Sequence, residues 1–167
     1  MFYSRENLKE VGLLYCSLHG IQLSKTLGFG LQGVVYATTR RSAVKIHCRK
    51  EAYVRERNVY LRLTEEKVQN VKGLIVPQLL QYDDDKLIIE MELVSPPFIV
   101  DFGGAYLDVL PAHATGTMTL SQWDIDKREQ FGENWLKAQA IIAEFAGMYS
   151  IHIVDVNPGN IRFKSEE

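Results

Sequence analysis

Residues 27–46 decide the fold, and they read LGFGLQGVVYATTRRSAVKI. The stretch opens with the spacing GxGxxG, which Gly28, Gly30 and Gly33 make. Glycines let backbone N–H groups approach phosphate oxygens, because no Cβ stands in the way. Residues 33–39 are β-branched and aromatic and therefore predict a strand. Since a dinucleotide-binding turn leads into a helix, the pattern favours a glycine-rich flap between antiparallel strands, with a plain tight turn as the alternative.

The next predicted strand, residues 42–47, carries a lysine near its centre. Alternation along a strand places Ala43 and Lys45 on one face, and Val44 and Ile46 on the other. Burying a lysine between apolar neighbours is unfavourable unless an anionic group lies beside it. We therefore expect a carboxylate partner, with a lysine at the sheet edge that points into water as the alternative.

The helix predicted over residues 50–66 offers two glutamates for this role. Glu56 lies one turn before Tyr60, which belongs to the expected packing stripe of the helix. We choose Glu56 as the partner of the lysine and Glu51 as the second choice. The alternative is that Glu56 is one more solvated charge on a helix rich in charges.

A fourth motif lies near the end of the chain, where Asp155 stands five positions before Asn160 with Pro158 between them. An aspartate can accept a proton from a nucleophile, and Mg²⁺ prefers oxygen ligands of the kind that both residues supply. Asparagine, proline and glycine are also ordinary turn residues, so a simple turn is the alternative.

The four motifs, in this order, resemble the protein-kinase superfamily over residues 21–163. The resemblance implies an α+β fold of the protein-kinase type. It has a five-stranded antiparallel small lobe with one inserted helix, and a reduced, mainly helical large lobe. The implied division is an N-terminal helix at 1–20, the small lobe at 21–95 and the helical lobe with the catalytic loop at 96–167. Residues 95–97, Ser-Pro-Pro, mark the boundary.

The resemblance also implies ATP and Mg²⁺ as cofactors, and transfer of the terminal phosphate to a hydroxyl of a protein or small molecule. Lys45 would grip the phosphates, Glu56 would hold Lys45, Asp155 would be the catalytic base and Asn160 would bind the metal. The segment 91–94 resembles the hinge that holds adenine. The implied nucleotide-binding residues are Gly28, Gly30, Gly33, Val35, Ala43, Lys45, Glu92 and Val94.

The chain departs from the family pattern in four places. The family has His-Arg before the catalytic aspartate, where this chain has Ile153-Val154, and ordinary Ser/Thr kinases usually have Lys where this chain has Asn157. The resemblance stops soon after Asn160, which implies a minimal, atypical kinase reduced after the catalytic loop. The family's second metal-binding aspartate, in Asp-Phe-Gly, follows the asparagine, whereas here Asp101-Phe102-Gly103 precedes it.

Two interpretations of Asp101 follow. In the favoured one it caps the next helix, and in the other a rearranged chain path brings it to the metal. The missing second metal ligand also keeps two alternatives to an active kinase. One is a catalytically inactive pseudokinase that binds nucleotide as a regulatory module, and the other is an interaction domain without nucleotide.

Other expected elements are assigned by periodicity and turn residues. They are a helix at 4–18 ended by Gly20, strands at 73–82 and 86–94, a short helix at 104–110, a loop at 111–122, a helix at 131–150 with a stripe of Trp135, Ala138, Ile142 and Phe145, and a short strand at 161–163.

The composition excludes several classes of protein. A net charge of −2 gives no basic field to recruit nucleic acid or anionic lipid. Two cysteines and four scattered histidines form no zinc motif. The sequence has no apolar run of membrane-spanning length and no signal peptide, so we expect a cytoplasmic protein.

Overall fold

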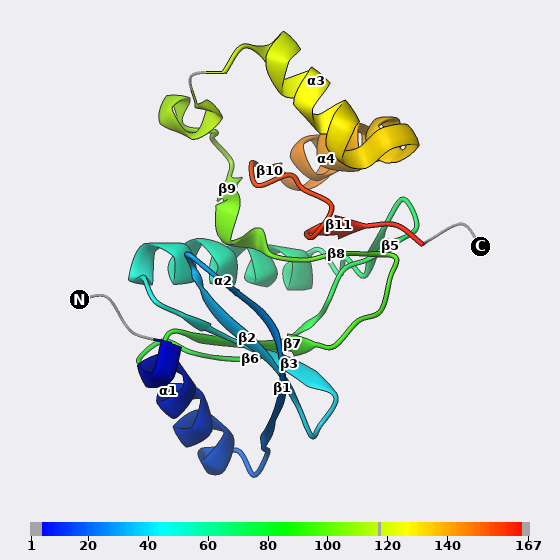
Figure 1. Cartoon of the computed structure of the whole chain (residues 1–167). Helices are drawn as coiled ribbons and strands as arrows, with labels where there is room; N and C mark the ends of the chain where they lie inside the picture. Colours follow the sequence, from blue (N-terminus) through cyan, green and yellow to red (C-terminus); the bar gives the residue numbers. More distant parts are fainter. Residues whose placement is uncertain (1–4, 117, 165–167) are drawn as a thin grey trace.

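A five-stranded antiparallel sheet forms the centre of the N-terminal half in the computed structural model, which describes residues 5–116 and 118–164 (Figure 1). The strands lie in the order β1-β2-β3-β7-β6. Their bounds are β1 Leu23–Gly30, β2 Gly33–Thr38, β3 Ser42–His47, β7 Ile88–Glu92 and β6 Leu79–Asp83. The prediction of an antiparallel five-stranded sheet is therefore confirmed.

The alternation of β3 gives the sheet two different faces. The helix α1 (Arg5–Leu18) lies on one face (Figure 1), and Val44 and Ile46 are fully buried in the cluster that it covers. Lys45 points to the other face, where it contacts Glu56. Burial of each of these two apolar side chains contributes roughly 1.5–3 kcal/mol. Gly20, with φ of +65°, follows the end of α1 as expected.

The helix α2 (Lys50–Glu65) covers the opposite face of the sheet (Figure 1). Its buried residues recur at helical spacing and form one stripe: Ala52, Tyr53, Glu56, Val59, Tyr60 and Leu63. Glu56 is the charged member of that stripe. The sequence pattern that makes α2 a helix therefore also places the Glu56 carboxylate on the side of the helix that packs against the sheet.

Short strands join the rest of the chain to this half. A second sheet has the order β11-β8-β5-β4, and β9 pairs with β10 in a two-stranded sheet. Their bounds are β4 Asn70–Val71, β5 Leu74–Ile75, β8 Phe98–Ile99, β9 Ala105–Leu107, β10 Ile151–Ile153 and β11 Ile161–Arg162.

Two predictions fail in this region. The strand expected at 73–82 is divided into β5 and β6, because Pro77 lies between them and has no N–H for a ladder. The short helix expected at 104–110 is wrong: the 3₁₀ helix η1 (Phe102–Gly104) is followed by β9, whose pairing with β10 overrides local propensity.

Two helices, α3 (Leu120–Phe131) and α4 (Trp135–Tyr149), form the far end of the molecule (Figure 1). The 3₁₀ helix η2 (Ala112–Thr115) precedes α3. The 3₁₀ helix η3 (Gly132–Asn134) separates α3 from α4. The predicted helix at 131–150 thus begins later, and part of the predicted loop at 111–122 is helical.

The helix α3 was missed because its apolar pattern is weak and Phe131 is its buried residue. Thr119 caps it, since its Oγ1 accepts a hydrogen bond from the N–H of Gln122 at 3.3 Å. In α4, Ile141 rather than Ile142 is fully buried in the stripe. The division of the chain near residue 95 stays a prediction. Over the described residues, none of the helices combines the length and apolar character needed to cross a bilayer.

Candidate functional site

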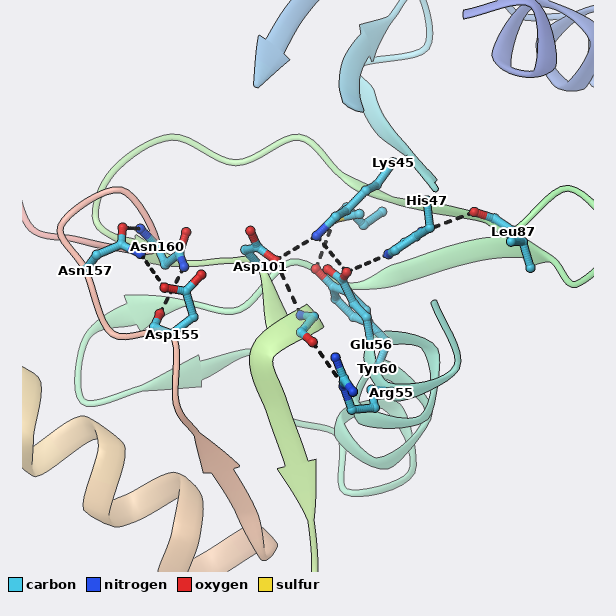
Figure 2. A network of polar contacts seen from close by, with 12 residues as sticks. Lys45, His47, Arg55, Glu56, Tyr60, Leu87, Asp101, Asp155, Asn157 and Asn160 are labelled. Carbon is cyan, nitrogen blue, oxygen red and sulfur yellow. Dashed lines mark hydrogen bonds and ion pairs between the residues drawn. The ribbon is translucent and has the colours of Figure 1, made fainter. Parts of the chain in front are cut away.

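Lys45 lies between two carboxylates at the centre of the site (Figure 2). Its Nζ is 2.7 Å from Glu56 Oε2 and 2.6 Å from Asp101 Oδ1, and its side chain is only 5% exposed. The predicted contact between Lys45 and Glu56 is confirmed. Glu51, the second choice, is exposed on α2.

The charges of this pair follow from their surroundings. Burial alone would raise the pKa of Glu56, but Lys45 and His47 outweigh it and lower that pKa to about 2. Burial would lower the pKa of Lys45, yet Glu56 and Asp101 together raise it. Burial, with the two carboxylates, raises the pKa of Tyr60 well above its usual value. At neutral pH the site therefore holds an ammonium, ionised Glu56 and a neutral phenol.

Asp101 has two roles at once. It is the N-cap of η1, where its Oδ1 accepts a hydrogen bond from the N–H of Gly103 at 3.3 Å. The capping interpretation is thus confirmed. The same carboxylate also faces Lys45, with φ of +64° at Asp101. It is therefore a second acidic group beside the lysine, which the favoured interpretation did not include.

Strand pairing carries Asp101 to the loop 155–160. Pairing of β8 with β11 and of β9 with β10 lines up the two segments, and Val100 N–H donates to Asn160 O at 2.8 Å. A Cβ on Gly104 would lie 2.8 Å from Cβ of Asp155, so only glycine permits this approach. The chain order of the two segments is thus reversed relative to the kinase pattern, yet they lie side by side.

Hydrogen bonds within the loop 155–160 fix its polar side chains (Figure 2). The Oδ1 of Asn157 accepts from the N–H groups of Gly159 at 2.9 Å and Asn160 at 3.2 Å. Its Nδ2 must therefore face Asp155, to whose Oδ1 it donates at 2.9 Å. Asn160 Nδ2 donates to the backbone O of Asp155 at 3.0 Å. Within residues 5–116 and 118–164, Asp155 Oδ2 and Asn160 Oδ1 accept no hydrogen bond.

A cavity of about 540 Å³ opens in front of Lys45. Most of the predicted nucleotide-binding residues line it: Gly28, Val35, Ala43, Lys45, Glu92 and Val94. Glu56, Met91, Asp101 and Asn160 line it as well. A second hollow of about 360 Å³ lies under the flap and is lined by Gly28, Gly30, Gly33, Lys45, Asp101 and Asp155, among others. All the predicted site residues are thus brought around one continuous region.

Two of the predicted binding residues have a different local role from the one expected. A Cβ on Gly33 would lie 2.0 Å from the carbonyl O of Ile46, so this glycine is required by the close approach of β3. In the predicted hinge segment 91–94, the N–H of Glu92 donates to Gln78 O at 2.9 Å and is not free for a ligand. Within the described residues, no backbone acceptor engages the N–H of Val94.

The donor set is suited to a hard divalent cation. Asp101 and Asn160 supply oxygens at the same cavity, and Mg²⁺ commonly takes one or two such protein ligands together with phosphate oxygens. In residues 5–116 and 118–164, no group of three or more His, Cys, Asp or Glu side chains could hold a metal alone. The residues therefore fit a metal that arrives with a phosphate ligand rather than a self-sufficient metal centre.

Sequence reasoning missed His47, which contacts Glu56 at 2.7 Å, and gave Asn157 no role. His47 could have been found, because it lies two residues after Lys45 and so shares its face of β3. Asn157 could not, because its role depends on how the loop folds back on itself.

Comparisons with known proteins give a likeness in fold. Neither a family model nor a curated protein matches the sequence. Among solved structures, the streptomycin–ATP–APH(2″)-IIa ternary complex is similar, with a TM-score of 0.44 and 11% sequence identity. The match covers 83% of this chain and 40% of that chain, so this chain spans less than half of that protein.

Proposed function

We propose that the chain binds Mg-ATP in the cavity under the glycine flap and transfers the terminal phosphate to a hydroxyl group of a protein or small molecule. The observation that carries the proposal is the position of Lys45. Its ammonium is buried between Glu56 and Asp101 and opens onto the same hollow as Asp155. An ammonium that carboxylates hold in place at an open cavity can donate charge-assisted hydrogen bonds to phosphate oxygens.

Binding would use both ends of the cavity. Adenine would lie between Val35, Ala43 and Met91, whose side chains line the cavity, and accept a hydrogen bond from the N–H of Val94. The triphosphate would extend under the flap toward Lys45. Lys45 would neutralise phosphate charge while Glu56 keeps the ammonium in place.

Transfer would follow from the geometry of the loop 155–160. Asp155 Oδ2 accepts the proton of the acceptor hydroxyl, whose oxygen forms a bond to the terminal phosphorus as the bond to the ADP oxygen breaks. Asn157 orients the Asp155 carboxylate through Oδ1. Asp101 and Asn160 would hold Mg²⁺, which when bound offsets the charge that develops on the phosphate oxygens.

Binding is tested first, by the shift in melting temperature and by calorimetry with Mg²⁺ and a non-hydrolysable ATP analogue. A ligand at 100 times its Kd stabilises the native state by about 2.7 kcal/mol. We expect Lys45→Met to abolish the shift, while the matched control Lys25→Met, an exposed lysine of β1, retains it. No shift in the wild type at millimolar nucleotide would refute the proposal and favour an interaction domain without nucleotide.

Transfer is tested separately, with labelled ATP and detection of phosphate on the protein itself, on candidate acceptors or in water. We expect Asp155→Asn to abolish transfer, and Asn157→Ala to lower kcat by about 10–100-fold with little change in KM for ATP, since it acts on orientation. Asp85→Asn, at the exposed turn before β7, is the control. Tight ATP binding with no Asp155-dependent transfer would support the pseudokinase alternative instead.

A further inference from the structure

His47 is a fully buried histidine whose ring belongs to the same cluster as Lys45 (Figure 2). It is the last residue of β3, and its side chain is 0% exposed. Its Nε2 lies 2.7 Å from Glu56 Oε2, the oxygen that Lys45 also contacts. Its Nδ1 lies 3.1 Å from the backbone O of Leu87.

Both ring nitrogens of His47 therefore face hydrogen-bond acceptors. A neutral imidazole carries one N–H and one lone pair, so one of its nitrogens would oppose an acceptor oxygen. Neither acceptor can supply a proton, because a backbone carbonyl has none and Glu56 is held as a carboxylate by the Lys45 ammonium 2.7 Å from its Oε2. The doubly protonated imidazolium donates to both and leaves no conflict in this buried place.

The charges around the His47 ring also favour its protonated form. Two residues of α2 face His47: Glu56, and Tyr53, whose ring lies edge-on with its centroid 5.5 Å from that of His47. Lys45 is linked to His47 through the Glu56 oxygen that both contact. Asp101 joins the cluster through Lys45. With an imidazolium the cluster holds two positive and two negative charges. With a neutral ring it would carry a net negative charge directly beneath the proposed phosphate site.

We propose that His47, as an imidazolium, is a positioning residue that shares the charge of Glu56 and so leaves the ammonium of Lys45 available to an anionic phosphate ligand. This inference rests on the proposed ATP function. Without the imidazolium, Glu56 and Asp101 together hold Lys45 more strongly, and the net charge of the cluster repels the triphosphate. The affinity for nucleotide then falls.

His47→Gln provides the test, because the Gln amide nitrogen occupies nearly the place of Nε2 and keeps the donor to Glu56 without the charge. We expect its Kd for Mg-ATP at pH 7 to rise about tenfold, because the variant lacks the positive charge of the imidazolium near the triphosphate. His47→Asn, which keeps the Leu87 contact and loses the Glu56 donor, should bind no better. His19→Gln, at the end of α1 on the other face of the sheet, should match the wild type.

The pH profile separates charge from packing. The ratio of the variant's Kd to the wild-type Kd, taken in the same buffers, should depend on pH, because an imidazole can carry a proton and a glutamine amide cannot. A purely structural role predicts a constant ratio, and that result, or a His47→Gln protein that binds like the wild type at pH 7, would overturn the proposal.

A measurement without nucleotide or variants covers the case in which a variant does not fold. The ¹⁵N spectrum of histidine-labelled wild type should contain one ring with both nitrogens protonated at pH 7. A neutral tautomer for every ring would overturn the proposal. If the wild type binds no Mg-ATP, the proposed function fails, and this spectrum still decides whether the imidazolium exists.

Discussion

Replacement of Glu56 by glutamine tests the buried ion cluster most directly. Glu56 is fully buried and is the shared partner of Lys45 and His47. Removing one member of a buried ion pair leaves the remaining charges without compensation and typically costs about 3–5 kcal/mol. Since Asp101 still contacts Lys45, we expect the lower end of that range, a loss of about 3 kcal/mol at pH 7.

The pH dependence of the unfolding free energy gives a second estimate of the contribution of Glu56. The pKa of Glu56 falls from 4.5 to about 2 on folding, and 2.5 units at 1.36 kcal/mol each correspond to about 3 kcal/mol. Because the folded pKa is the lower one, this stability is present above pH 4.5 and is lost as pH falls toward 2. The difference between the wild type and Glu56→Gln should therefore close over that interval.

The assay is urea unfolding followed by the fluorescence of Trp123 and Trp135, repeated from pH 7 to pH 2. Other carboxylates also titrate in this range, but they are common to both proteins and cancel in the difference. Glu51→Gln is the matched control and should change the unfolding free energy by less than about 1 kcal/mol, because Glu51 is exposed in the first turn of α2. A Glu56→Gln protein as stable as the wild type at pH 7, or a difference that is constant with pH, would refute this account.

Three further substitutions, one at the site and two elsewhere in the molecule, probe packing and buried hydrogen bonds by the same urea assay. Gly104→Ala should destabilise by about 1–3 kcal/mol and reduce transfer, because its Cβ would lie 2.8 Å from Cβ of Asp155; an unchanged protein would show that the two segments do not meet closely. Gly147→Ala has open space around it in α4 and should instead stabilise by about 0.5–1 kcal/mol. Tyr15→Phe should cost about 1–2 kcal/mol, because it removes a 2.8 Å hydrogen bond to the fully buried carboxylate of Glu90; no loss would mean that Glu90 keeps enough donors without Tyr15.

The half of the site around Lys45 and Glu56 could be predicted from the sequence because its elements are local and periodic. A strand of period two sets the direction of Lys45, and a helical stripe that includes Tyr60 sets the direction of Glu56. Side-chain direction is nearly fixed once the secondary structure is known. The flap, the strands β2 and β3 and the contact between these two residues therefore followed from residues 27–66.

The half of the site around Asp101 and the loop 155–160 depends on long-range pairing. The strands β8, β9, β10 and β11 have only two or three residues each, too few to carry a periodic signal. Their pairing joins segments more than forty residues apart along the chain and sets Asp101 beside the loop 155–160. The sequence alone predicted that Asp101 caps the next helix. That prediction is correct but does not include the contact of Asp101 with Lys45.

The sequence by itself determined the sheet, the helix α2 and the pair Lys45–Glu56, because each depends on the period of a strand or a helix. Only the tertiary structure decided that Asp101, Asp155 and Asn160 surround one cavity and that His47 completes the charge of the cluster. The physical reason is that the hydrogen bonds and charges of a buried group depend on all the neighbours that surround it in the folded chain. Those partners come from β3, α2, η1 and the loop 155–160, which no local pattern brings together.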